Sequence, residues 1–334
     1  IVEMVKENVL LSDILTRKAF ENAIMTNAAI GGSTNFIIHL LAIAGRIGVP
    51  LTLNDFDELS ANIPFIVNLQ PSGKYFMEDL YYAGGLPAAL KELDGFLHKD
   101  CITVNGRTIK ENYDSAKCYN KEVIASADKP FNPLAGVAIL KGNLCENGAV
   151  IKPSAASAHL MKHTGKAVVF EDIDDYKNRV DDPNLDVDEN SILVLKNVGP
   201  IGYPGMPEVG NMSLPKKLLA KGIHDLIRIS DGRMSGTGFG TVVLHASPEA
   251  ALGGNFAVVQ SGDIISLDVP NRSLKLEVSD AELQKRKKNW KPIHKTYDRG
   301  YVRLYQQHVE QADVGADMNY LKGGSGSEVS RDSH

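Results

Sequence analysis

The chain has 334 residues, of which 43% are hydrophobic and 23% charged, the composition of an ordinary globular protein with a substantial core. Its formal net charge of −5 and its scattered lysines and arginines argue against a nucleic-acid-binding surface, and no apolar run reaches the ~18–20 residues that cross a bilayer. The three widely spaced cysteines include no C-x-x-C pair and fit a reducing compartment, which we take to be the cytoplasm, better than a disulfide framework.

The first third of the chain is predicted to be mainly helical. Apolar residues recur at helical spacing over residues 12–49, and the pair Gly31-Gly32 interrupts them. Further helices are predicted at 55–62 and at 75–93, the second broken at Gly84-Gly85, with a short strand-like run at 65–69 between them. The expected capping residues are Ser12 or Asp13, Ser33 or Thr34, and Asn54.

From residue 135 onward the pattern changes to short apolar runs bounded by Gly, Asp, Asn and Pro, which predict strands. The predicted strands are 136–140, 149–151, 167–170, 192–195, 226–229, 241–244, 257–259, 264–269 and 274–278, with a hairpin turn at 269–274. The predicted helices between them are 155–163, 172–180, 214–221 and 280–288. The last twelve residues, GGSGSEVSRDSH, are polar, and we expect them to be mobile or to lie on a surface.

The fold class is therefore predicted to be α/β. A mainly helical N-terminal segment precedes a mixed β-sheet or β-barrel-like domain flanked by helices. We place the domains at residues 1–115 and 131–334, and interpret the polar, irregular stretch 100–130 as the link between them.

Two glycine-rich segments, GPIGYPGMPEVGNM (199–212) and HDLIRISDGRMSGTGFG (224–240), are the best candidates for a ligand site. Glu208 follows residues that fix the backbone, so its carboxylate is either a ligand for a hard cation such as Mg²⁺ or a surface acid after a turn. Ser235 follows a predicted strand, and Arg233 beside it suits carboxylate recognition. Because a serine is a poor base without a neighbouring cation, this loop is either catalytic or a glycine-rich turn that only binds an anion.

The histidines give weaker signals. His39 lies in an apolar helical pattern and is interpreted as a core residue. His159 and His163 are expected to share a helix face, but the spacing lacks the catalytic glutamate of a zinc motif. His245 ends a predicted strand near the Ser235 segment, where it could support the site from behind.

In these two loops and in further segments before and after them, the chain resembles the dihydroxy-acid dehydratase / 6-phosphogluconate dehydratase family, and within it the branch acting on sugar acids such as arabinonate or xylonate. Two details favour that branch: Glu208 stands in PGMPEVGNM, and the serine loop reads GRMSGTGFGT. The matching segments are GGSTNFIIHLLAIAGRIG, LTLNDFDEL, PSGKYFMEDLYYAGGLPAALKEL, GNLCENGAVIKPSAAS, VFEDIDDY, GPIGYPGMPEVGNM, SDGRMSGT, HASPEAALGG and SGDIISLDVPNR.

The resemblance implies a hydro-lyase that converts a sugar acid into its 2-keto-3-deoxy acid, using a [2Fe-2S] cluster and Mg²⁺. It implies that Ser235 accepts the C2 proton, that Glu208 binds Mg²⁺, and that Thr237, with Arg233, contacts substrate. It also implies that the cluster ligands lie in a preceding region of about two hundred residues or more. Residues 1–115 would then end the cluster-bearing domain, and the chain by itself is expected to be inactive and not to bind the cluster.

Other functions remain open at this stage. Within the family, the substrate could be a branched-chain dihydroxy acid or 6-phosphogluconate, although a phosphorylated substrate should require more basic residues near Ser235 than Arg228 and Arg233. Outside it, the chain could be a non-catalytic domain that binds carboxylates or assembles with partners. The resemblance and the apolar helices near the start suggest a homodimer or a homotetramer.

Overall fold

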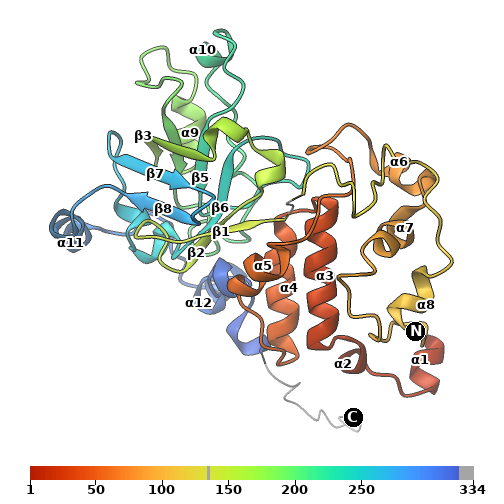
Figure 1. The fold of residues 1–334 in the computed structure, drawn as a ribbon. Coiled ribbons are helices and arrows are strands. Elements are labelled where there is room, and N and C mark those ends of the chain that lie inside the picture. Colours follow the sequence, from red (N-terminus) through yellow and green to blue (C-terminus); the bar gives the residue numbers. More distant parts are fainter. Residues whose placement is uncertain (134–135, 323–334) are drawn as a thin grey trace, which may run out of the picture.

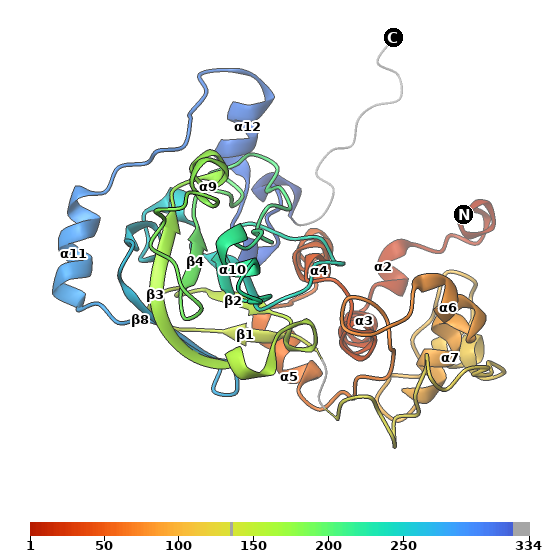
Figure 2. The same ribbon diagram turned by 90° about the horizontal axis from the view of Figure 1, so that it is seen from above.

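The computed structural model describes residues 1–133 and 136–322, which form a helical part followed by a curled sheet (Figure 1). Both views show α4 on the side of the helical part that faces the sheet, with α3 behind it and α6–α8 farther away (Figures 1 and 2). The helices of the first part are α1 (Val2–Lys6), α2 (Leu11–Ile14), α3 (Arg17–Ile30), α4 (Asn35–Arg46), α5 (Leu53–Ser60), α6 (Met77–Tyr82), α7 (Gly85–Glu92) and α8 (Ile109–Tyr113).

Most of the predicted N-terminal helices are confirmed, but two caps are different residues. Thr16, not Ser12 or Asp13, caps the long first helix, and its hydroxyl accepts from the Ala19 amide. Thr52 replaces Asn54 as the cap of α5, in a reciprocal pair of hydrogen bonds with Asp55. The stretch 100–130 also contains α8, and Tyr113, like residues 123–124, is buried among the helices.

The sheet contains eight described strands in the order β1-β2-β6-β5-β4-β3-β7-β8. Its centre, β3 to β6, is parallel, whereas β1, β2, β7 and β8 are added in antiparallel pairs. Lys141 bridges to Ser273, so β8 meets the end of β1 and the sheet nearly closes into a barrel. The strands are β1 (Ala138–Leu140), β2 (Gly148–Ile151), β3 (Lys162–Phe170), β4 (Ile192–Leu195), β5 (Ile227–Ser230), β6 (Val242–Ser247), β7 (Ile264–Asp268) and β8 (Ser273–Leu276).

The burial of each strand follows from its place in the sheet. The central strands β4, β5 and β6 are buried on both faces, as is typical of parallel sheets covered on two sides. The hairpin strands β7 and β8 alternate between buried and more exposed residues, as expected of an antiparallel edge. The α/β fold class with a helical segment and a barrel-like mixed sheet is thus confirmed.

Helices cover the outside of the barrel. α9 (Ile173–Arg179) and α10 (Lys216–Leu219) pack on the outer face of β3 and β4, and α3, α4 and α5 pack against β1 and β2. The last part of the chain contributes α11 (Asp280–Asn289) and α12 (Gly300–His308), of which α12 was not predicted. Short 3₁₀ helices occur at Pro153–Ala155, Ala158–Leu160, Ala250–Leu252, Phe256–Val258, Ala312–Val314 and Asn319–Leu321.

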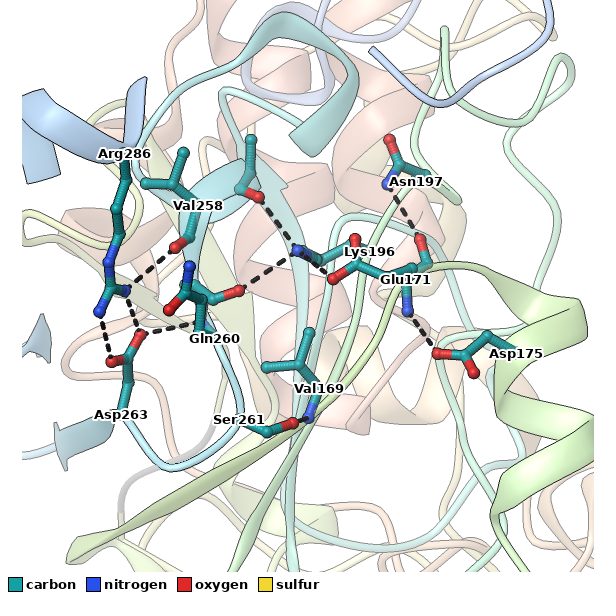
Figure 3. Close-up of polar contacts among 12 residues, drawn as sticks. Val169, Glu171, Asp175, Lys196, Asn197, Val258, Gln260, Ser261, Asp263 and Arg286 are labelled. Carbon is teal, nitrogen blue, oxygen red and sulfur yellow. Dashed lines mark hydrogen bonds and ion pairs between the residues drawn. The ribbon is translucent and has the colours of Figure 1, made fainter. Parts of the chain in front are cut away.

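Two predicted elements of the second part are wrong. Residues 155–163 do not form a single α-helix: the stretch contains the end of one short 3₁₀ helix and the whole of another, and from Lys162 onward the chain pairs with β7 as the first half of β3. Residues 257–259 are not a strand, since the buried ammonium of Lys196 takes the carbonyl oxygens of Ala257 and Val259 at 3.0 and 3.3 Å (Figure 3). Glu171 completes the Lys196 site at 2.8 Å. In both places tertiary partners override a local pattern. The predicted polar tail, 323–334, lies outside the described residues.

Candidate active site

The two glycine-rich loops leave the same edge of the sheet. β4 and β5 are neighbouring parallel strands in which Leu195 is level with Ser230. The loop carrying Glu208 follows β4, and the loop carrying Ser235 follows β5. Because parallel strands end together, both loops start side by side, at the place where open α/β sheets bind ligands.

Asp231 ties the starts of the two loops together. It directly follows β5 and is fully buried, and its carboxylate accepts hydrogen bonds from the backbone amides of Asn197 at 3.1 Å, Val198 at 3.0 Å and Ala250 at 2.9 Å. Burial, with the nearby Glu249 carboxylate, raises the pKa of Asp231 to about 7, and the three N–H donors oppose that rise. The exit of β4 is therefore fastened to the residue that opens the serine loop.

Glu249 holds the next part of the Glu208 loop. Its buried carboxylate accepts from the amides of Ile201 and Gly202 at 2.8–3.0 Å and from the side chain of Gln311 at 2.6 Å. Burial raises the pKa of Glu249, while these hydrogen bonds lower it. The buried carboxylates of Asp231 and Glu249 therefore hold the first part of the Glu208 loop, residues 197–202, by its backbone amides.

The loops come into direct contact beyond these anchors. The Gly210 amide donates to the Arg233 carbonyl at 2.7 Å, and the Arg233 amide to the Pro207 carbonyl at 3.4 Å. A Cβ on Gly210 would lie 2.6 Å from Leu244 and 2.9 Å from the Arg233 carbonyl oxygen. Only glycine allows this approach, which brings Glu208 and Ser235 to the same face of the sheet domain.

The helical part also contacts both loops, through the first residue of α4 and the turn before it. The side-chain amide of Asn35 donates to the Glu208 carboxylate and, at 3.1 Å, to the carbonyl of Met234, the residue before Ser235. Gly236 packs so closely on Ser33 that an added Cβ would lie 3.0 Å from it. Ser33 and Asn35 were not predicted as site residues, although both lie in the segment GGSTNFIIHLLAIAGRIG.

Ser235 is exposed and its hydroxyl lies 3.1 Å from that of Thr237, which is also exposed. The Gly238 amide donates to the Ser235 carbonyl at 3.0 Å and closes the turn between the two hydroxyls. A pair of neighbouring hydroxyls on a tight turn can bind a polyhydroxy ligand and exchange a proton with it. The roles predicted for Ser235 and Thr237 remain predictions.

The metal and cluster predictions differ in how well the chain supports them. Glu208 offers Mg²⁺ an exposed hard oxygen, and among the described residues only Asn35 donates to its carboxylate. In the described part of the chain, the surroundings of Glu208 included, no group of three or more His, Cys, Asp or Glu residues could hold a metal ion, so Glu208 would be a single ligand. Cys145 lies in the barrel core, where burial raises its thiol pKa, and Cys101 and Cys118 are half-buried in the helical part. These cysteines do not fit a [2Fe-2S] cluster.

The Arg233 side chain binds the Glu208 loop. Its Nε donates to the Met206 carbonyl at 2.6 Å, and its side chain borders a cavity of about 370 Å³ that Ser235 and Glu208 do not line. The other walls come from α4, from residues 205–206, from Tyr305 in α12 and from residues 315–317. The substrate contact predicted for Arg233 remains a prediction.

Two of the histidines, His39 and His163, differ from their predictions. His39 is not a core residue: it lies on the exposed side of α4 and borders the same cavity as Arg233. His163 lies in β3 with its ring 2.9 Å from the Asn190 carbonyl, so it does not share a helix face with His159. His245 is buried, and neither ring nitrogen has a hydrogen-bond partner among the described residues. Burial, with the charges of Arg233 and His39, lowers the pKa of His245 to about 3.

Comparison with known proteins identifies the family. Residues 122–316 match the model of the C-terminal domain of dihydroxy-acid/6-phosphogluconate dehydratases, and residues 1–112 match that of the N-terminal domain. The chain belongs to the dihydroxy-acid/6-phosphogluconate dehydratase family. The family predicted from the sequence segments is thereby confirmed.

Individual relatives agree with the predicted branch. L-arabinonate dehydratase of Rhizobium leguminosarum bv. trifolii is 59% identical over the whole chain, and L-arabonate dehydratase of Azospirillum brasilense is 54% identical. A dihydroxy-acid dehydratase of Ignicoccus hospitalis is 43% identical over 96% of the chain. The chain spans 58–59% of the length of these relatives. Among the described residues, no helix is long and apolar enough to cross a membrane.

Proposed function

We propose that this chain carries part of the active site of a sugar-acid dehydratase, a hydro-lyase that removes water from C2 and C3 of an aldonate. The relatives named for arabinonate support the substrate class. The observation that carries the chemistry is the junction of three segments, in which one amide from α4 contacts both Glu208 and the residue before Ser235.

Ser235 is the proposed acceptor of the C2 proton. Its exposed hydroxyl stands at the tip of a loop anchored by Asp231, so it can approach a substrate carbon without moving the sheet. Thr237, 3.1 Å away, can donate to the Ser235 oxygen or to a substrate hydroxyl. As an alkoxide, Ser235 takes the C2 proton and becomes a hydroxyl, and the C3–O bond breaks as the C2=C3 double bond forms. The leaving hydroxide takes that proton back from Ser235 and departs as water, which restores the alkoxide. The remaining enol becomes the 2-keto-3-deoxy acid by tautomerisation.

Glu208 is the proposed ligand for Mg²⁺ from this chain. When bound, Mg²⁺ would offset negative charge at the carboxylate end of the substrate and favour deprotonation of a nearby hydroxyl. Glu208 presents its carboxylate beside the Ser235 loop, as that role requires. No step is assigned to an iron–sulfur cluster here, because the three cysteines of this chain do not fit one.

A phosphorylated substrate receives less support. Of the two arginines near Ser235, Arg228 is buried and donates to Asp225, to Asn211 and to two backbone carbonyls. The terminal nitrogens of Arg228 are therefore already used in hydrogen bonds that hold the loops. Of these two arginines, only Arg233 is left to bind a phosphate, whereas a sugar acid requires mainly hydroxyl and carboxylate recognition.

The proposal also includes a cytoplasmic homodimer or homotetramer. Exposed apolar residues in α1 and α2 support an interface with another chain.

The test is Ser235→Ala in the complete protein, assayed for keto-acid formation from a panel of aldonic acids. Loss of the base is expected to lower kcat by about 10²–10⁴-fold while substrate binding persists. Thr237→Val is the matched control, with a smaller decrease in kcat. Unchanged turnover of the Ser235 variant would exclude Ser235 as the proton acceptor. Weaker substrate binding with unchanged kcat would instead indicate that Ser235 only binds the substrate.

A further inference from the structure

One side chain, Asn35, contacts both loops of the candidate site. It is the first residue of α4, and its Nδ2 donates to Oε1 of Glu208 and, at 3.1 Å, to the carbonyl oxygen of Met234. A carboxylate and a carbonyl only accept hydrogen bonds, so the nitrogen of the amide must face them. The orientation of Asn35 is therefore fixed by chemistry, and its Oδ1 is left without a partner among the described residues.

The position of Asn35 is fixed as firmly as its orientation. The hydroxyl of Ser33 accepts from the Asn35 backbone amide at 3.2 Å, and Gly236 packs on the Ser33 side chain. On the other side, the buried ammonium of Lys152 donates to the Gly31 carbonyl at 2.5 Å, which links the end of β2 to the turn between α3 and α4. The turn that presents Asn35 is thus attached to the sheet domain at two points.

The bridge has a direct consequence for the exposed carboxylate of Glu208. A free glutamate on a loop samples several rotamers, whereas a hydrogen bond to one oxygen restricts it and leaves Oε2 to meet a cation. The same amide holds the carbonyl next to Ser235, so one group sets the spacing between the proposed metal ligand and the proposed base. Partners that hold a metal-ligating carboxylate in this way commonly contribute about 10–100-fold to metal affinity or activity.

We propose that Asn35 is a positioning residue that orients Glu208 for a divalent cation and fixes Glu208 relative to Ser235. This inference rests on the proposed function, since it takes Glu208 as a Mg²⁺ ligand. The opposite role is also physically defined. If the Asn35 amide only took the place of a cation on the Glu208 carboxylate, it would compete with Mg²⁺. Removing the Asn35 side chain would then tighten Mg²⁺ binding.

The experiment measures Mg²⁺ binding by titration calorimetry in the complete protein, without substrate. The variants are Asn35→Ala and Asn35→Leu, the second keeping the side-chain size and a good helix former at the start of α4. Asn289→Ala is the control, because Asn289 is an exposed helical asparagine whose side chain donates a hydrogen bond to the Lys285 carbonyl of its own helix. Glu208→Gln is the reference for loss of the ligand, and thermal unfolding is recorded for all four.

We expect both Asn35 variants to bind Mg²⁺ about 10–100-fold more weakly than wild type, at an unfolding midpoint close to that of the Asn289 control. In turnover, kcat should fall more than KM rises. Wild-type or tighter Mg²⁺ binding by the Asn35 variants, with weakened binding by Glu208→Gln, would overturn the role of Asn35 alone. Wild-type binding by Glu208→Gln would remove the proposed metal ligand and, with it, the role inferred for Asn35.

Discussion

Gly210 marks the closest approach of the Glu208 and Ser235 loops, and Gly210→Ala is the sharpest test of how tightly they must fit. A Cβ at this position would lie 2.6 Å from Cδ2 of Leu244 and 2.9 Å from the Arg233 carbonyl oxygen. Ordinary contact begins at 3.4 Å. Leu244 belongs to a buried strand, and the Arg233 carbonyl is backbone, so neither neighbour can swing away.

The magnitude follows from these distances. To restore contact with the carbonyl, the loops must separate by about half an ångström, which also weakens the 2.7 Å hydrogen bond from Gly210 to Arg233. Overpacking costs about 1–3 kcal/mol and the hydrogen bond about 1 kcal/mol, so unfolding should require about 2–4 kcal/mol less free energy. Because a misplacement of about 1 Å can cost about 10²-fold in rate, we expect kcat to fall about tenfold.

The assay compares Gly210→Ala with Gly95→Ala in the complete protein, by denaturant unfolding and by keto-acid formation. Gly95 has open space around an added Cβ, so its variant should stay within about 0.5 kcal/mol of wild type. If the two variants unfold at the same midpoint and turn over at the same rate, the loops do not need the close approach described here, and the reasoning is refuted.

Two further variants test the groups that fasten the loops and the two parts of the chain. Asp231→Asn should lower the free energy of unfolding by about 2–4 kcal/mol, because at least one of three backbone N–H donors then faces an amide NH₂ group; an unchanged denaturation midpoint would contradict this. Burial lowers the pKa of Lys152 from 10.5 to about 8, so between these values the unfolded chain binds the proton and the folded chain does not. The free energy of unfolding of the wild type should therefore rise with pH across this window, by up to about 1.4 kcal/mol per pH unit relative to Lys152→Met. If the two proteins show the same dependence of stability on pH, the pKa of Lys152 is not lowered by burial.

The fold was predictable wherever local and tertiary preferences agree. The helical repeat before Gly31 forms α3, and the apolar runs predicted as strands form β4 and β5, as their local patterns indicate. The errors fall where a distant partner decides. The first half of β3 is extended because β7 lies beside it, and the carbonyls of Ala257 and Val259 accept hydrogen bonds from Lys196 instead of from a neighbouring strand.

The candidate site shows the same division. The sequence marked Glu208 and Ser235 because glycines and prolines around them restrict the backbone, and that restriction is local. It gave no indication that Asp231 and Glu249 serve as buried acceptors for loop amides, since an acid in a loop has the same local pattern when it is exposed. His39 was misread for a related reason, because an apolar helix has two sides and its pattern does not say which neighbour covers each.

By itself, the sequence determined the family, the α/β class and the two loops, because these depend on residue types and spacings that can be read along the chain without knowing which segments are in contact. Only the tertiary structure decided that the loops after β4 and β5 lie side by side and that Asn35, from a helix 173 residues before Glu208, contacts them both. The reason is physical: contacts between segments distant along the chain arise from the order and register of strands and the packing of helices on them, and no local preference encodes that geometry.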